Sequence, residues 1–193
     1  MLVGILRLVD PEKAPDWSDS LLTKYNSLGR LFQEDTAVLS RLVSEEAAEV
    51  LAIIGAAIVE SCRPVPTFGP VLGHYQAVRD YLHVAMAHRL TESARLLHLN
   101  AKNLLIRDEQ ISEGTIDQVS IYVREVARRA LELGSAAVIL VHNHPSGDPT
   151  PSRQDISLTR QIAAALKPLG VHLYDHLIIA SGGHVSFREL GYI

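Results

Sequence analysis

Residues 136–155 read AAVILVHNHPSGDPTPSRQD, and this stretch decides the fold. It opens with an unbroken apolar run, Ala136–Val141, which is typical of a strand buried on both faces of a sheet. Alternating proline and glycine residues from Pro145 to Pro151 then indicate a stiff turning loop. A helical pattern follows over Ser152–Leu166. The stretch therefore predicts a strand–loop–helix unit within an α/β domain.

Two histidines and a carboxylate flank this loop. Residues two apart in a strand face the same side, so His142 and His144 can present both imidazoles to one point. The loop then brings the chain back to Asp155. Two histidines and a carboxylate, with a fourth position left for water, form the ligand set of a catalytic zinc. The residues therefore predict His142, His144 and Asp155 as ligands of Zn²⁺.

Each of these residues also has an ordinary structural interpretation. A His-x-His pair at a strand end, seen alone, is more often structural than metal-binding. Ser152 and Asp155 also fit a helix capping box, in which both side chains satisfy free backbone amides. Their joint occurrence at a strand end and a helix start favours the metal site. Further along, we interpret Asp175 and His176 as hydrogen-bonding groups rather than ligands.

The rest of the chain divides at a stretch rich in proline and glycine. Residues 1–65 predict a small helical subdomain, in which Ser44 caps a helix that runs to Val59. Residues 66–71 predict a linker, and residues 72–193 predict the α/β domain. In that domain we expect helices over 74–89, 124–133 and 152–166. We expect strands over 95–99, 104–107, 136–141, 171–174, 177–180 and 185–187.

Composition and charge exclude several classes of protein. Of 193 residues, 47% are hydrophobic and 21% charged, and one is cysteine, which excludes wholesale disorder and a disulfide scaffold. The N-terminus does not resemble a signal peptide and the apolar stretches are too short to span a membrane, so we expect a soluble, cytoplasmic protein. Residues 1–68 hold six Lys and Arg against ten Asp and Glu. This excess of negative charge argues against electrostatic binding of nucleic acid.

The loop residues carry a resemblance to a known family. The run from His142 to Pro145, followed by Ser152 and Asp155, resembles the JAMM motif of MPN-domain metalloproteases. Residues 123–155 resemble the RadC branch of that group, as do YDHLII over 174–179 and SFRELG over 186–191. The resemblance extends over residues 72–193. It implies an MPN (JAMM) fold, with a mixed curved sheet flanked by helices and preceded by a small all-α subdomain.

The resemblance also implies an activity, that of a zinc-dependent metallopeptidase-like hydrolase. Its substrate would be an amide or isopeptide bond in an unidentified peptide or protein. Glu92 matches the upstream glutamate of the motif and would be the general base, while Glu109 and Glu113 match the pattern less well. The Ser152 hydroxyl would stabilise the oxyanion together with the zinc. The sequence contains no HExxH, which excludes the helix-borne zinc site of other metalloproteases.

Two other functions remain as alternatives. The family label suggests an accessory protein of DNA repair or recombination, and a non-catalytic MPN scaffold is the third interpretation. The N-terminal part of the family usually ends in a helix-hairpin-helix with a Gly-x-Gly turn, whereas Leu42–Ala47 has no glycine pair and two carboxylates. This degenerate motif weakens the prediction of DNA binding. The complete ligand set with Glu92 argues against a scaffold, and the oligomeric state, a homodimer included, stays open.

Overall fold

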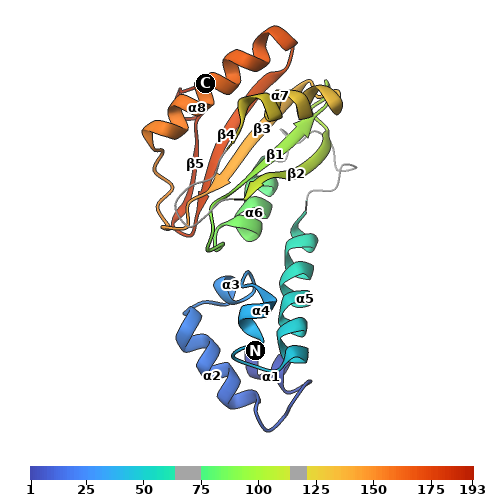
Figure 1. Ribbon diagram of the computed structural model, residues 1–193, viewed down its shortest axis with the longest axis vertical. Helices are drawn as coiled ribbons and strands as arrows, with labels where there is room; N and C mark the ends of the chain where they lie inside the picture. The colour runs from blue at the N-terminus through green and yellow to red at the C-terminus, as the bar shows by residue number, and fades with distance from the viewer. Residues whose placement is uncertain (64–74, 114–120) are drawn as a thin grey trace. The chain divides into compact units, whose positions relative to one another are not determined.

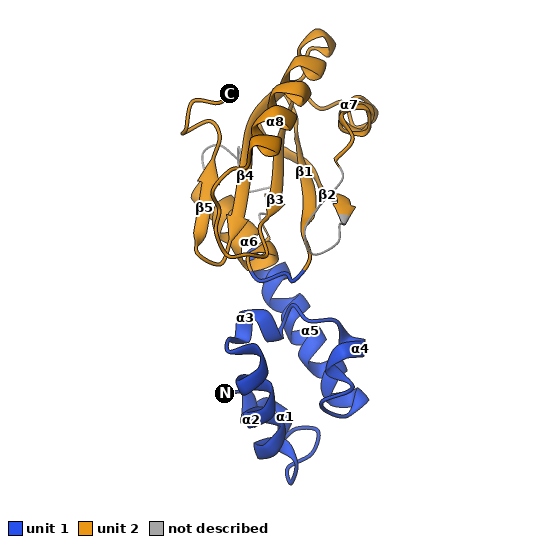
Figure 2. Ribbon diagram, turned by 60° about the vertical axis from the view of Figure 1, so that its left-hand side comes forward, with its two compact units in different colours: residues 1–62, 88–90 blue, residues 63–87, 91–193 orange. Residues whose placement is uncertain are grey.

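The computed structural model describes residues 1–63, 75–113 and 121–193, and the predicted linker over 66–71 lies outside them. The chain forms two compact units (Figures 1 and 2). Unit 1 consists of Met1–Cys62 with His88–Leu90, and unit 2 consists of Arg63–Ala87 with Thr91–Ile193. All the candidate site residues belong to unit 2. Among the described residues, no helix combines the length and apolar character needed to cross a membrane.

The regular secondary structure described in unit 1 is all helical. Its helices are α1 (Leu2–Leu6), α2 (Ala14–Tyr25), α3 (Leu28–Leu31), α4 (Thr36–Leu39) and α5 (Glu45–Cys62). The cap predicted for α5 is confirmed, because Ser44 Oγ accepts a hydrogen bond from the Ala47 amide at 3.2 Å. The helices enclose a small core that includes Leu6, Leu21 and Leu51. The short helices α1 and α3 were not predicted, since each has only one or two turns in which to show a periodic pattern.

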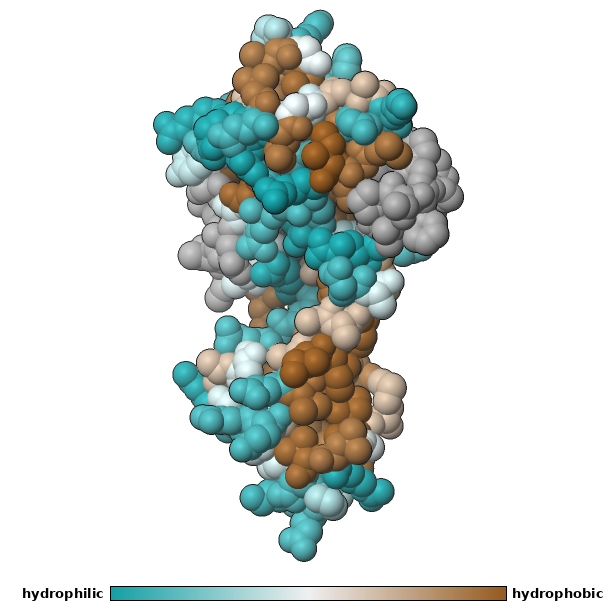
Figure 3. Space-filling view, turned by 90° about the vertical axis from the view of Figure 1, so that its right-hand side faces the viewer, coloured by the Kyte–Doolittle hydropathy of each residue, from teal (hydrophilic) through white to brown (hydrophobic). Residues whose placement is uncertain are grey.

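The outer face of α5 is apolar and exposed within unit 1 (Figure 3). Ile53 is 66% exposed, and Ala56 and Ala57 are exposed on the same side of the helix. Further along, Ile58 is 40% exposed. On the opposite side of the helix from Ile53, the residues Ala47, Ala48 and Leu51 pack into the core, whereas Ile58, two turns after Leu51 on that side, is exposed. The amphipathic character of α5 is therefore weak, and the core of unit 1 uses only part of its apolar surface.

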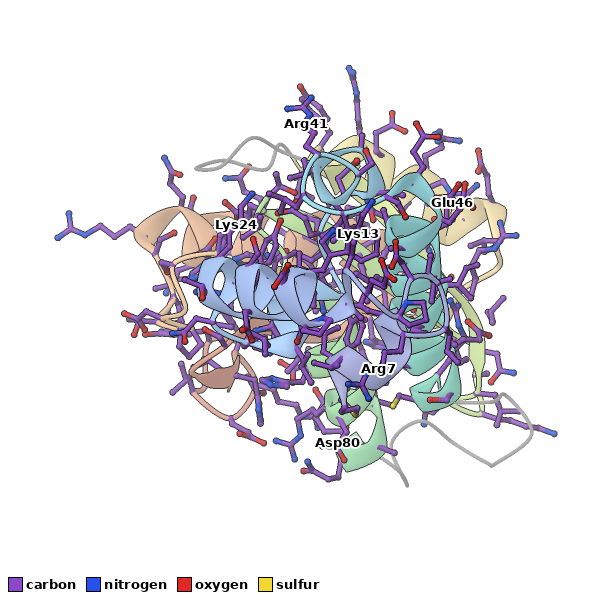
Figure 4. The ribbon with its side chains drawn as sticks, turned by 90° about the horizontal axis from the view of Figure 1, so that it is seen from below. Arg7, Lys13, Lys24, Arg41, Glu46 and Asp80 are labelled. Atoms are coloured by element: carbon purple, nitrogen blue, oxygen red, sulfur yellow. The ribbon has the colours of Figure 1, made fainter. Side chains whose placement is uncertain are left out.

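Four of the cations of unit 1 lie apart on its surface. Arg7, Lys13, Lys24 and Arg41 are all exposed, and they lie on separate parts of the unit (Figure 4). Lys13 faces Asp10, with 3.9 Å between Nζ and Oδ2. These four cations therefore do not form one clustered basic patch.

Unit 2 is built on a mixed sheet of five strands. They are β1 (Ser93–Leu99), β2 (Leu105–Glu113), β3 (Ala137–Asn143), β4 (His172–Ala180) and β5 (Gly183–Ser186), in the order β2-β1-β3-β4-β5. The central strand β3 pairs antiparallel with β1 and parallel with β4. Every residue of β3 is buried, as the unbroken apolar run predicted.

Helices cover both faces of this sheet. Alternation along β3 places Val138 and Leu140 on one face, where they pack in one core with α7 (Val123–Glu132) and α8 (Arg153–Leu166). Helix α6 (Tyr75–Met86) lies against the other face, since its Tyr81 hydroxyl donates to Asp108 on β2. This is the α/β architecture with a flanked mixed sheet that the sequence predicted. His142 shares its face of β3 with Leu140 and therefore points towards α8.

The fourth strand differs from its prediction. The two strands expected over 171–174 and 177–180 form one continuous strand, because Asp175 and His176 take part in the pairing with Ile139 and Leu140. Both are buried. The Asp175 carboxylate accepts hydrogen bonds from the Tyr75 and Ser186 hydroxyls and from two backbone amides, which compensates its burial.

A third buried histidine, besides His142 and His176, lies at the other end of the sheet. His98 on β1 has no exposed surface, and its Nδ1 lies 2.8 Å from Ser135 Oγ while its Nε2 lies 3.2 Å from Glu109 Oε1. Arg129 on α7 holds the Glu109 carboxylate through two hydrogen bonds. Burial lowers the pKa of His98, and this effect outweighs the opposing attraction of Glu109.

This lowered pKa predicts how stability depends on pH. Below pH about 6.5 the unfolded chain protonates His98 while the folded chain holds it neutral, so the free energy of unfolding should fall as the pH falls. One such group contributes at most about 1.4 kcal/mol per pH unit. Urea unfolding of the zinc-free protein at pH about 7.5 and about 5.5 should show a smaller difference for His98→Gln than for the wild type. An equal difference in both proteins would contradict the prediction.

Candidate metal centre

Strand β3 delivers both histidines to the same side of the sheet. His142 is the sixth residue of the strand and pairs with Ala94 on β1 and Ile178 on β4. His144 lies one residue beyond the strand, but its amide still donates to the carbonyl of Ile179 at 2.9 Å. The alternation of the strand therefore continues through His144. As a result the two Nε2 atoms lie 3.0 Å apart.

The first turn of α8 supplies the carboxylate. Ser152 caps the helix: its Oγ accepts from the Asp155 amide at 3.1 Å, and its own amide donates to Asp155 Oδ2 at 2.8 Å. The Asp155 carboxylate also faces the imidazoles, with Oδ1 3.3 Å from His142 Nε2 and Oδ2 3.7 Å from His144 Nε2. The capping interpretation and the ligand interpretation of Asp155 are thus compatible, because one carboxylate makes both sets of contacts.

The spacing of these three groups fits a tetrahedral cation. Ligand atoms about 2.0–2.1 Å from a tetrahedral zinc lie roughly 3.3 Å from one another. The two histidine Nε2 atoms lie 3.0 Å apart, and the Asp155 carboxylate places Oδ1 3.3 Å from His142 Nε2 and Oδ2 3.7 Å from His144 Nε2. Two imidazole nitrogens and a carboxylate oxygen are also donors that zinc accepts. Both the spacing and the chemistry of the three residues are therefore suited to zinc.

The loop after β3 fixes the His144 ring. Its Nδ1 lies 2.8 Å from the carbonyl oxygen of Asp148, which can only accept, so Nδ1 carries a proton and donates it. In the neutral ring, Nε2 then has a free lone pair. The loop is tied to the β4–β5 turn, where the Gly182 amide donates to the Gly147 carbonyl at 3.0 Å. A Cβ on Gly182 would lie 2.6 Å from that carbonyl oxygen, so this close approach requires glycine.

Glu92 lies beside the two histidines. It precedes β1, and one carboxylate oxygen lies within 4.8 Å of a ligand nitrogen of both His142 and His144. Asn143 holds the segment that carries it: Oδ1 accepts from the amide and the hydroxyl of Ser93, and Nδ2 donates to the Thr91 carbonyl. The middle residue of the His-Asn-His run thus holds the chain on either side of Glu92. Sequence reasoning did not identify this role of Asn143.

The electrostatics differ for each group. Burial raises the pKa of Glu92, with Asp155 adding to the effect and His144 opposing it. Burial lowers the pKa of His142 to about 4, against the pull of Asp155. The contact with the Asp155 carboxylate raises the pKa of His144. Burial alone would raise the pKa of Asp155, but its contacts with His144, His142 and Ser152 together hold it below the ordinary value.

The remaining candidates occupy different positions. The exposed Ser152 hydroxyl accepts from the Asp155 amide, which leaves its own proton available for donation. Glu109 is bound to Arg129 and His98 and is not part of the cluster. The side chain of Glu113 lies outside what the structure describes. Of the two glutamates whose side chains the structure describes, Glu92 and Glu109, Glu92 is therefore the one that the fold places with the histidines.

Comparisons with known proteins agree with this fold. A family model described as the RadC-like JAB domain matches residues 72–192. A UPF0758 protein of Rhodobacter capsulatus is 49% identical over 173 residues, which are 89% of this chain and 81% of the relative. A second UPF0758 protein, from Ruegeria pomeroyi, is 44% identical over 178 residues, 90% of this chain and 78% of the relative. From these matches, the chain belongs to the RadC family.

Proposed function

We propose that the protein is a zinc-dependent metallopeptidase-like hydrolase that cleaves an amide or isopeptide bond. The observation that carries this proposal is the convergence of two imidazole nitrogens and a carboxylate at tetrahedral spacing beside a second carboxylate, Glu92. Zinc, when bound by such a set, supplies a water with a pKa near 7 and polarises a carbonyl oxygen. The protein residues carry out the remaining tasks.

Glu92 moves the proton. Burial raises the pKa of the Glu92 carboxyl group towards neutral pH, which makes the ionised carboxylate a stronger base. The carboxylate accepts a proton from water as the water oxygen forms a bond to the carbonyl carbon. Glu92 then donates that proton to the leaving nitrogen as the C–N bond breaks. The Ser152 hydroxyl donates a hydrogen bond to the carbonyl oxygen, on which negative charge develops. The products are a carboxylate and an amine.

The test uses one preparation of the full chain in three states: zinc-loaded, stripped with a chelator, and reloaded. Each is incubated with a mixed peptide library and with peptides that contain a Lys ε-amide branch, and mass spectrometry follows the products in ¹⁸O-water. We expect cleavage with ¹⁸O in the new carboxylate only when zinc is present. If the zinc-loaded chain cleaves neither substrate class, the proposal is wrong. Salt-sensitive DNA binding without cleavage would favour the accessory role instead.

A further inference from the structure

A chain of hydrogen bonds runs from the His142 ring back to the backbone of Asp155. His142 Nδ1 lies 2.8 Å from His176 Nε2, and His176 Nδ1 lies 2.6 Å from Thr159 Oγ1. The Thr159 hydroxyl in turn donates to the carbonyl oxygen of Asp155 at 2.6 Å. Thr159 is one turn after Asp155 on α8, while His176 lies on β4. Two predicted metal ligands, His142 and Asp155, are thus joined through two residues that are not ligands.

The direction of each hydrogen bond follows from the last acceptor. A carbonyl oxygen can only accept, so the Thr159 hydroxyl uses its single proton on Asp155. Its oxygen must then accept from Nδ1–H of His176. In a neutral His176 ring the Nε2 lone pair is left to accept from Nδ1–H of His142. The Nε2 atom of His142, which faces Asp155 Oδ1 and His144 Nε2, is then free of a proton.

Packing holds this arrangement in place. His142 is 1% exposed, and His176 and Thr159 are fully buried, so water has no access to exchange with these hydrogen bonds. The Phe187 ring stacks on His176 with 4.4 Å between centroids and 28° between planes, which fixes the imidazole plane. Among the described residues, no carboxylate forms a hydrogen bond with His176, as would be expected for a neutral ring.

We propose that Thr159 and His176 are positioning residues that hold His142 in its Nδ1-protonated tautomer and thereby keep Nε2 ready for a metal. This inference rests on the proposed zinc site. The opposite tautomer of His142 carries a proton on Nε2 and cannot bind a metal there until that proton moves. Thr159 sets the direction of these hydrogen bonds because its hydroxyl donates to a carbonyl oxygen, which can only accept.

The decisive variant is Thr159→Val, which keeps the shape of the side chain and removes the hydroxyl. Without that hydroxyl, neither direction of the His176–His142 hydrogen bond is preferred, so part of the population should protonate His142 at Nε2. Thr159→Ser keeps the hydroxyl and is the matched control. Competition with a chromophoric chelator measures zinc affinity, and ¹⁵N NMR of the histidine rings in the metal-free protein reports the tautomer. Circular dichroism verifies that each variant is folded.

We expect Thr159→Val to bind zinc about 10–100-fold more weakly than the wild type, and Thr159→Ser to bind it like the wild type. In the metal-free wild type and in Thr159→Ser, Nε2 of His142 should carry no proton, whereas Thr159→Val should show both tautomers. Wild-type affinity in Thr159→Val, or a proton on Nε2 of His142 in the wild type, would overturn the proposal. A wild type that binds no zinc would refute the proposed function, and the NMR result alone would then decide this inference.

Discussion

Replacing His144 with alanine should empty the metal centre, whereas replacing Glu92 with glutamine should leave it filled. The wild type should contain about one zinc per chain, held by His142, His144 and Asp155. Loss of one of three ligands leaves two, too few for a site that also keeps a water. Glu92 touches that water rather than the ion in the proposed mechanism, so its amide analogue should retain the metal. Elemental analysis of the purified proteins measures the outcome.

A matched control is available on the same unit. His172 is an exposed histidine at the start of β4, and His172→Ala should keep its zinc. His142→Ala and Asp155→Ala should both behave like His144→Ala. Loss of zinc from Glu92→Gln as complete as from His144→Ala would mean that Glu92 is a ligand, and the assignment of roles would then be wrong.

Glu92→Gln should also reduce hydrolysis by about 10²–10⁴-fold on any substrate found for the wild type. The amide cannot accept the proton of the water, although it has nearly the same shape as the carboxylic acid. Parallel measurements of zinc content and of kcat/KM separate the loss of the base from the loss of the metal. Glu189→Gln is a suitable control, because this exposed glutamate contacts Arg79 on the surface.

The same residue determines the acid side of the pH profile. The base must be ionised to accept a proton, so kcat/KM should rise with pH through the pKa of Glu92. Because burial raises that pKa, the rise should lie at higher pH than for an ordinary glutamate. If Glu92→Gln keeps activity within about tenfold of the wild type, the general base is another group.

Local patterns were sufficient to predict the centre of unit 2. The apolar run over 136–141 predicts a buried strand, the two-residue alternation places His142 and His144 together, and the capping pattern fixes where α8 begins. Each of these depends on residues close in sequence, and the structure reproduces each of them. Glu92 lies fifty residues before His142, so no local pattern connects the two. Only the family resemblance singled it out.

The supporting contacts could not be predicted for a related reason. The Asn143 contacts with the segment before β1 depend on the register between β1 and β3, which follows from the packing of the whole sheet. Likewise, the hydrogen bond between Thr159 and His176 depends on how α8 packs against β4. The sequence shows these residues as an ordinary asparagine and threonine. Their importance follows from which elements the fold brings together.

Asn143 makes the position of Glu92 depend on the pairing of β1 with β3. Its hydrogen bonds join the residues around Glu92 to the strand that carries both histidines, at the β1–β3 ladder. A local opening event that separates these strands would move Glu92 away from the two histidines, so the complete site exists only while the β1–β3 ladder is closed. The Ser93 amide, which donates to Asn143, would report this event by hydrogen exchange. Its protection should equal that of the central strands and exceed that of the surrounding loops.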